Sequence, residues 1–249
     1  METLKVTLGL PLKEDRFGKP DEVMRAVRVG IDNMHNYSID YFAKKGIDFK
    51  LYEIKSASGD PVESRTRIVD HMVGSHIFFL DADSYPDPNC LVKLLEADKD
   101  FVAAPMVQQG YPHFTNVFTR VHGANYNSWR VGRDFNEPDV IMGKIKECDA
   151  HGFGGVLLRR EVFDEIRPPW FNRISHPHFP VINYGHDVSF SIRAKEAGLQ
   201  IFTHFGAKVR HASVAYLWLD PHMEAFTMDP ALANTELSDS LIEKEVYLA

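Results

Sequence analysis

Several features are scarce in this 249-residue chain, and each absence excludes a class of protein. Cysteine occurs only at Cys90 and Cys148, which argues against the disulfide framework of a secreted domain. No apolar run approaches the roughly 18–20 residues that a membrane-spanning helix needs. The amino-terminal residues also lack the basic region and apolar core of a signal peptide. We therefore expect a cytoplasmic protein that does not span a membrane.

Positive charge is scarce as well. The chain has 28 Lys and Arg residues against 35 Asp and Glu residues, which gives a formal net charge of −7. Because no block of basic residues offsets this balance, we do not expect a nucleic acid partner. The hydrophobic fraction of 44% and the charged fraction of 25% are ordinary for a globular protein, and the length suffices for one substantial core.

Short apolar runs alternate with amphipathic stretches through most of the chain, a pattern typical of an α/β fold with a largely parallel sheet. Asp60 followed by Pro61 and Glu63 predicts a capped helix start, and Gly198 predicts a helix end. The expected strands are 4–10, 49–54, 76–80, 101–104, 156–158, 199–203 and 207–210, and the expected helices are 21–35, 61–73, 89–97, 160–166 and 188–197.

Two regions depart from this alternation. Between residues 106 and 147 the pattern becomes irregular and rich in aromatic residues, which indicates a small antiparallel insert. The residues from about 234 onward are acidic and favour a helix, either packed on the domain or available to a partner.

Two carboxylates follow an especially apolar strand. Asp81 and Asp83 come directly after Leu80, where the expected strand 76–80 ends. In an open α/β sheet, ligands bind beyond the carboxyl ends of the strands, and two carboxylates there can share a divalent cation with a diphosphate. The alternative is that Asp83 begins a turn while Asp81 is solvated, and the spacing alone does not decide between the two.

Further landmarks surround this D-x-D motif, and their order resembles that of the GT-A glycosyltransferases, especially the family 2-like enzymes that transfer a sugar from a nucleotide-sugar. The resemblance extends over residues 3–212. The landmarks are an arginine on the preceding helix (Arg67, with Arg65 as the fallback), the glycine-rich segment 151–163, the pair His186 and Asp187 at a helix start, and His211 at the end of a strand.

The resemblance implies a GT-A, Rossmann-like fold, in which helices flank a mostly parallel central sheet and a small antiparallel insert is added. It implies a glycosyltransferase domain at 1–212, with a nucleotide-binding half at 1–105 and an acceptor half at 106–212, followed by a C-terminal tail or helix at 213–249. The implied substrates are a nucleotide-sugar, UDP-linked by prior, and an acceptor with a free hydroxyl, such as a saccharide or another small molecule. The oligomeric state stays open.

The same resemblance implies roles for particular side chains. In inverting members of the family, the second acid of the pair at this helix start takes a proton from the acceptor hydroxyl, and this role falls on Asp187. The residue before it is ordinarily Glu, so His186 departs from the pattern. A site for Mn²⁺ or Mg²⁺ is implied, with Asp83 and His211 as ligands and Asp81 on the ribose or on the ion through water. A helix cap at Asp187 and an ordinary partly buried His211 are the alternatives.

The remaining assignments rest on position in the fold. For Arg67 the alternative is a pair with Asp70 or Glu63 on the helix surface. For Gly154 and Gly155 it is a turn without a ligand, and for Trp170 it is a place in the core. The expected nucleotide-sugar contacts are Leu10, Pro11, Glu53, Arg67, Asp81 and Ala82, and the expected contacts to the acceptor or donor sugar are Gly154, Gly155, His186 and Trp170.

Three rival functions stay open. A retaining GT-A enzyme would use the same motif, with Asp187 positioning substrate instead of removing a proton. A phosphohydrolase of the haloacid dehalogenase type also places Asp-x-Asp at a strand end, but Tyr85 stands where that family has Thr or Val. An inactive nucleotide-sugar-binding module is the third, and the unusual His186 motivates it.

Overall fold

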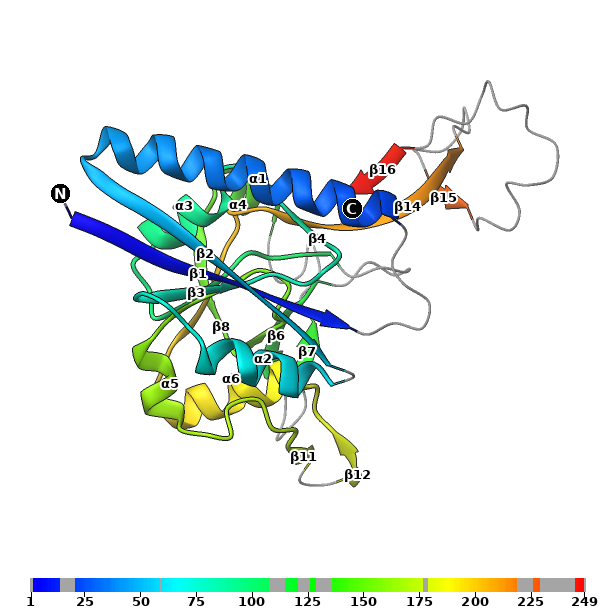
Figure 1. The fold of residues 1–249 in the computed structure, drawn as a ribbon. Coiled ribbons are helices and arrows are strands. Elements are labelled where there is room, and N and C mark those ends of the chain that lie inside the picture. Colours follow the sequence, from blue (N-terminus) through cyan, green and yellow to red (C-terminus); the bar gives the residue numbers. More distant parts are fainter. Residues whose placement is uncertain are drawn as a thin grey trace.

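The structure of the chain, a computed structural model, alternates strands and helices (Figure 1). It describes residues 2–13, 21–58, 60–107, 115–120, 126–128, 136–176, 179–218, 226–228 and 245–248. The helices are α1 (Asp21–Lys44), α2 (Pro61–Asp70), α3 (Cys90–Glu96), α4 (Glu137–Ile141), α5 (Glu161–Ile166) and α6 (His186–Glu196). The strands are β1 (Glu2–Lys13), β2 (Ile47–Ser58), β3 (His76–Phe79), β4 (Ser84–Pro86), β5 (Phe101–Ala103), β6 (Val117–Arg120), β7 (Tyr126–Ser128), β8 (Ile145–Cys148), β9 (Ala150–His151), β10 (Val156–Arg159), β11 (Ser175–His176), β12 (Phe179–Asn183), β13 (Ile201–His204), β14 (Val209–Trp218), β15 (Phe226–Met228) and β16 (Glu245–Leu248).

The central sheet has seven strands in the order β2-β1-β3-β10-β5-β13-β8. Strands β1, β2 and β3 are parallel, whereas β10 is antiparallel to β3 and β5, and β8 is antiparallel to β13. In register, Gly9 of β1 lies beside Ile54 of β2 and Phe79 of β3, so all three strands run toward the same edge. The mostly parallel sheet confirms the expected α/β class, and the loop after β3 leaves the sheet at this edge.

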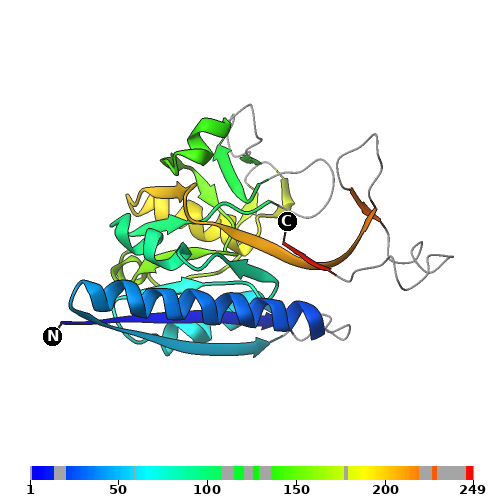
Figure 2. The same ribbon diagram turned by 90° about the horizontal axis from the view of Figure 1, so that it is seen from above.

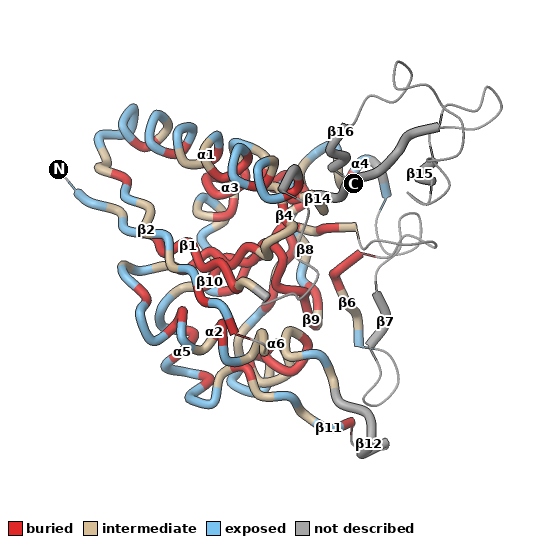
Figure 3. Tube along the Cα trace, turned by 45° about the vertical axis from the view of Figure 1, so that its right-hand side comes forward, coloured by how far each residue is buried: buried red, intermediate tan, exposed pale blue. Residues whose placement is uncertain are grey.

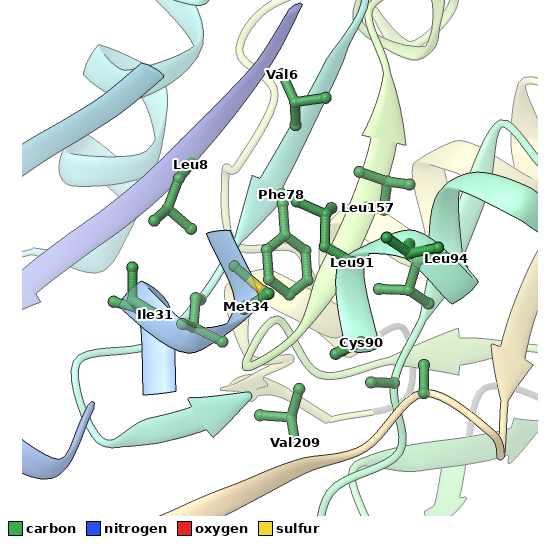
Figure 4. Packing of buried hydrophobic residues seen from close by; sticks show 14 of the residues in the cluster. Val6, Leu8, Ile31, Met34, Phe78, Cys90, Leu91, Leu94, Leu157 and Val209 are labelled. Atoms are coloured by element: carbon green, nitrogen blue, oxygen red, sulfur yellow. The ribbon is translucent and has the colours of Figure 1, made fainter. Parts of the chain in front are cut away.

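Helices cover both faces of the sheet, and a cluster of buried apolar side chains lies under each layer (Figures 1 and 3). On one face, Leu8 and Phe78 of the sheet pack with Met34 of α1 and Leu91 of α3 (Figure 4). On the other face, apolar side chains of α2, α5 and α6 pack against Phe79 and its neighbours. Ile77, Phe78 and Phe79 of β3 are fully buried, as expected for a strand that is covered on both faces.

A smaller antiparallel pairing holds the segment after the D-x-D motif. Strand β4 pairs with β14, which also pairs with β15 and β16. Figure 2 shows β14 extending beyond the central sheet with β16 beside it. The chain close to the D-x-D motif is therefore anchored to a strand that comes late in the sequence.

Several elements differ in extent from the expected ones. Helix α1 continues to Lys44 because Ser38 and Phe42 keep the buried helical spacing past residue 35. Strands β6, β7 and β9 form an antiparallel sheet, in agreement with the expected insert. In the tail expected to be helical from about residue 234, residues 245–248 form strand β16, and 229–244 lie outside the described residues.

The two halves of the expected domain share the central sheet. Strands β1, β2, β3 and β5 come from the first half, and β8, β10 and β13 come from the second. The expected boundary after residue 212 falls inside β14. In the part of the chain that the structure describes, no helix combines the length and apolar character needed to cross a membrane.

Candidate functional site

The D-x-D motif lies in a tight turn at the edge of the central sheet. Leu80 is fully buried, and its main-chain N–H donates to the carbonyl oxygen of Gly9 at 3.0 Å. The next three residues are partly exposed, and the N–H of Ser84 closes the turn on the carbonyl oxygen of Asp81 at 2.9 Å. Both carboxylates stay partly exposed within this turn. The presence of the turn therefore does not exclude a ligand site at the same residues.

A buried arginine holds the first carboxylate of the motif. Arg65 Nη2 donates to Asp81 Oδ1 at 2.7 Å, and the Arg65 side chain is only 4% exposed. Arg67 is 56% exposed and pairs with Glu63 one turn earlier on the same helix. Residues two apart on a helix point to different sides, so only one of these arginines faces the site. The structure brings Arg65 to the D-x-D motif and leaves Arg67 on the helix surface.

The strand pairing of β4 with β14 brings His211 to the segment that follows the D-x-D motif. His211 lies directly opposite Ser84, the residue that follows Asp83. Such antiparallel partners have their Cα atoms roughly 4.5–5.5 Å apart. His211 Nδ1 lies 2.6 Å from the carbonyl oxygen of Val107. A carbonyl only accepts hydrogen bonds, so Nδ1 carries a proton and donates it, and metal-binding histidines commonly make such a bond through the nitrogen that does not hold the metal.

The donor groups at this place suit a divalent cation that is shared with a ligand. Among the described residues, no group of three or more His, Cys, Asp or Glu side chains is placed to hold a metal ion. Asp83 and His211 are a carboxylate and an imidazole in neighbouring segments, and Asp81 forms an ion pair with Arg65. A cation bound here would complete its coordination with diphosphate oxygens and water, which is how Mg²⁺ and Mn²⁺ are commonly held.

Asp187 occupies the first turn of α6, with one carboxylate oxygen against the main chain. Its Oδ1 accepts from the N–H of Val188 at 2.8 Å, and its main-chain oxygen accepts from Ser191 Oγ at 2.9 Å. Its Oδ2 faces Gly152, where an added Cβ atom would lie 3.5 Å away. The carboxylate therefore lies beside the glycine-rich segment, with one oxygen held by the helix start.

His186 is a neutral partner of the buried arginine. Its Nε2 forms a hydrogen bond with Arg65 Nη1. A guanidinium only donates, so His186 accepts through Nε2 and carries its proton on Nδ1. Burial, together with the positive charge of Arg65, lowers the pKa of His186 to about 4. The side chain is uncharged at neutral pH.

The residues expected around the nucleotide have varied surroundings. Leu10 and Pro11 are buried at the end of β1, and Leu10 belongs to the core on the α1 face. Glu53 lies on β2, several residues before the end of that strand. Its carboxylate oxygens lie 2.6 Å from Arg28 Nη1 and 2.7 Å from Lys55 Nζ. Partial burial opposes ionisation of Glu53, but hydrogen bonds from these two cations lower its pKa overall. Ala82 is partly exposed between the two motif carboxylates.

The glycines expected to contact a sugar are packed against protein. Gly154 and Gly155 are buried, and a Cβ atom on Gly154 would collide with Met106. A Cβ atom on Gly155 would lie 2.8 Å from Val209 Cγ2. In the structure, the close approach that these glycines allow is to protein side chains, which corresponds to the turn alternative.

Trp170 lies away from Asp187. Its Nε1 donates to the carbonyl oxygen of Phe163 at 2.9 Å, and its own carbonyl oxygen accepts from Arg193. Arg193 is in the last turn of α6, whereas His186 and Asp187 are in the first. The neighbouring Phe171 is fully buried in the core, so the structure places both aromatic side chains in packing roles.

The order of the motifs favours Arg67 over Arg65 as the arginine that faces the site, although the pattern of apolar residues in the same helix favours Arg65. Arg65 lies three and four residues before Ile68 and Val69, which are both buried. That spacing places all three on one face of α2, and Arg67 falls outside it. The carbonyl partner of His211, at Val107, had no sequence signal because any residue supplies a carbonyl.

Comparisons with known proteins identify the family of the chain. A family model described as "Glycosyl transferase family 2" matches residues 38–167, just over half of the chain. Similar solved structures include A197 from STIV, with 14% identity and a TM-score of 0.45 over 92% of this chain and 95% of that chain. They also include GalNAc-T7 with UDP, GalNAc and Mn²⁺, with 11% identity and a TM-score of 0.51 over 84% of this chain. This chain spans 43% of the GalNAc-T7 chain, and at that identity the likeness is one of fold. No curated protein sequence matches significantly.

Proposed function

The chain belongs to glycosyl transferase family 2 and is a glycosyltransferase, and we propose that it transfers a sugar from a UDP-linked donor to an acceptor hydroxyl with the help of Mn²⁺ or Mg²⁺. The acceptor is a saccharide or another small molecule with a free hydroxyl, and Asp187 is the base. The phosphohydrolase alternative does not agree with the family assignment.

One observation carries the metal part of this proposal. The pairing of β14 with β4 puts His211 opposite Ser84, the residue that follows Asp83. The two proposed ligands come from distant parts of the sequence, and this pairing supports the proposal that both reach one cation near the end of β3. The GalNAc-T7 structure, which has a similar fold, contains UDP and Mn²⁺, and this supports the choice of ligands.

In this proposal, different residues bind the cation, contact the nucleotide and remove the proton. A cation held by Asp83 and His211 would neutralise charge on the departing diphosphate. Asp81 contacts the ribose or reaches the cation through water, and the buried ends of β1 and β2 lie beside the nucleotide. Asp187 accepts the proton of the acceptor hydroxyl as that oxygen bonds to the anomeric carbon and the bond to UDP breaks. Displacement from the opposite side inverts the anomeric configuration.

A retaining reaction is the second candidate. It would use the same cation and donor, with Asp187 positioning substrate. The configuration of the product distinguishes the two, because only direct displacement inverts the anomeric centre. Proton NMR of the product formed from a UDP-α-sugar reports this: a β-linked product supports the inverting reaction, and an α-linked product contradicts it.

The substitution Asp187→Asn tests the base. We expect transfer to fall by on the order of 10²–10⁴, the usual worth of a general base, with binding of UDP and Mn²⁺ nearly unchanged. UDP release from a panel of UDP-sugars measures the first quantity, and isothermal titration measures the second. The matched control is Asp164→Asn, which removes an exposed carboxylate at the start of α5. If Asp187→Asn weakens nucleotide binding as strongly as transfer, the carboxylate is not the base.

A further inference from the structure

A single buried side chain touches the three segments that form the site. Arg65 of α2 reaches Asp81 in the D-x-D turn through Nη2 and His186 at the start of α6 through Nη1. Its Cζ atom also lies 5.4 Å from the ring centroid of Phe153, in the glycine-rich segment. Each of these contacts is made by the guanidinium group, so its orientation fixes three elements relative to one another.

The geometry of this contact requires arginine. The two Nη atoms point in different directions from one rigid plane, and each meets a different partner. Arg65 Nε is buried and has no hydrogen-bond partner among the described residues. The plane is therefore oriented by the carboxylate, the imidazole and the ring face of Phe153. A lysine ammonium carries its three donors on one nitrogen, so it cannot present two separate, fixed donor nitrogens to the two partners.

Arg65 is also held firmly because its charge is buried. A buried cation is costly unless a carboxylate and hydrogen-bond acceptors surround it. Asp81 supplies the charge and His186 supplies the second acceptor. Loss of either partner leaves part of the guanidinium unsatisfied, so a change on one side of the bridge is transmitted to the other.

We propose that Arg65 is a positioning residue that couples the start of α6, where Asp187 lies, to the D-x-D turn that binds the donor. This inference rests on the proposed function, because it assumes that the turn binds a nucleotide with a cation. It assigns Arg65 to protein partners instead of to the diphosphate. It also gives His186 a defined task, which is to accept from Arg65 Nη1 and keep the guanidinium directed at Asp81.

The sharpest test changes His186 and measures binding at the other end of the bridge. The probe is UDP with Mn²⁺, which carries no sugar, so loss of a contact between His186 and a sugar cannot explain the result. His186→Leu removes the acceptor, and we expect UDP to bind about tenfold more weakly in the presence of Mn²⁺, the effect of losing one hydrogen bond to a charged group. His186→Gln keeps an acceptor oxygen, and we expect affinity within about twofold of the wild type.

A second pair of variants establishes the coupling. Arg65→Lys keeps the positive charge but reaches only one partner, so we expect a loss similar to that of His186→Leu. The double variant should bind UDP with Mn²⁺ no more weakly than Arg65→Lys alone, because the bridge is already broken. The matched control is Arg159→Lys, since Arg159 also reaches two partners, Asp98 and Asp100, from the far end of β10. This control should bind like the wild type.

The outcomes separate this inference from the proposed function. If the wild type does not bind UDP with Mn²⁺, the proposed function is wrong. If the wild type binds and Arg65→Lys or His186→Leu binds equally well, the bridge does not position the turn and the inference is overturned. The inference is also overturned if the two losses add in the double variant, or if His186→Gln is as weak as His186→Leu. Thermal melting of each variant shows that the folded protein is being compared.

Discussion

At the scale of single residues, partners determine which state each histidine adopts. His211 donates through Nδ1 to the carbonyl oxygen of Val107. His186 accepts from an arginine and stays neutral. His151 is fully buried, its Nδ1 is bonded to the carbonyl oxygen of Gly152, and its Nε2 has no partner among the described residues. Sequence alone marked two of these three as functional but did not distinguish their protonation states, because tertiary contacts set them.

The burial of His151 predicts a dependence of stability on pH. Burial lowers the pKa of His151 to about 4, whereas in the unfolded chain it titrates near its ordinary value of 6.5. Between these values only the unfolded state binds the proton, so the free energy of unfolding falls as the pH is lowered through this window. For this group the loss is about 2 kcal/mol between pH 6.5 and 5.

Urea unfolding of the wild type and of His151→Gln across this range measures the effect. The variant lacks the titrating group, so its stability should fall less steeply with decreasing pH than that of the wild type. The comparison removes the background contributed by the carboxylates, which titrate in both proteins. Equal slopes for the two proteins would mean that His151 takes up its proton in the folded state as readily as in the unfolded chain.

At the scale of elements, local signals predicted the helices and strands better than their pairing. The start of α2 lies where the sequence placed it, because the cap depends only on Asp60 and the residues just after it. The pairing of β4 with β14 was not predicted, because it joins residues that are far apart in the chain and depends on how the sheet folds. The proposed metal site depends on this pairing, which puts His211 opposite Ser84 next to the D-x-D motif in the chain.

The cap of α2 can be tested directly. Asp60 Oδ1 accepts from the N–H of Val62 at 3.0 Å, so Asp60→Ala should lower the free energy of unfolding by about 1 kcal/mol. Asp60→Asn keeps an acceptor oxygen and should stay within about 0.5 kcal/mol of the wild type, because the pair that Asp60 forms with Arg173 is exposed. Urea denaturation measures both variants. Equal stability of Asp60→Ala and the wild type would show that water replaces the cap without cost.

At the scale of the whole molecule, the net charge of −7 is a poor guide to the ligand. The carboxylates of Asp81, Asp83 and Asp187 contribute to it, yet they lie with Arg65 and His211 in the region where a cation and an anionic diphosphate are proposed to bind. The net charge therefore does not exclude an anionic ligand. The fold class and the order of the motifs were predictable from the sequence, and the spacing of Arg65 from Ile68 and Val69 already indicated the buried face of α2, whereas the contact of Arg65 with Asp81 depends on the tertiary fold.

The central claim is that Asp83 and His211 bind a divalent cation together with a nucleotide diphosphate. Thermal melting with UDP, with Mn²⁺, and with both tests it most directly, because a ligand that binds only the folded state raises the melting temperature. We expect the wild type to melt about 5–10 °C higher with saturating UDP and Mn²⁺ together than with either alone. Asp83→Ala should lose this shift, and Asp100→Ala, which removes an exposed carboxylate paired with Arg159 outside the site, should keep it. Equal stabilisation by UDP in the presence of a chelator, or a full shift in Asp83→Ala, would contradict the account.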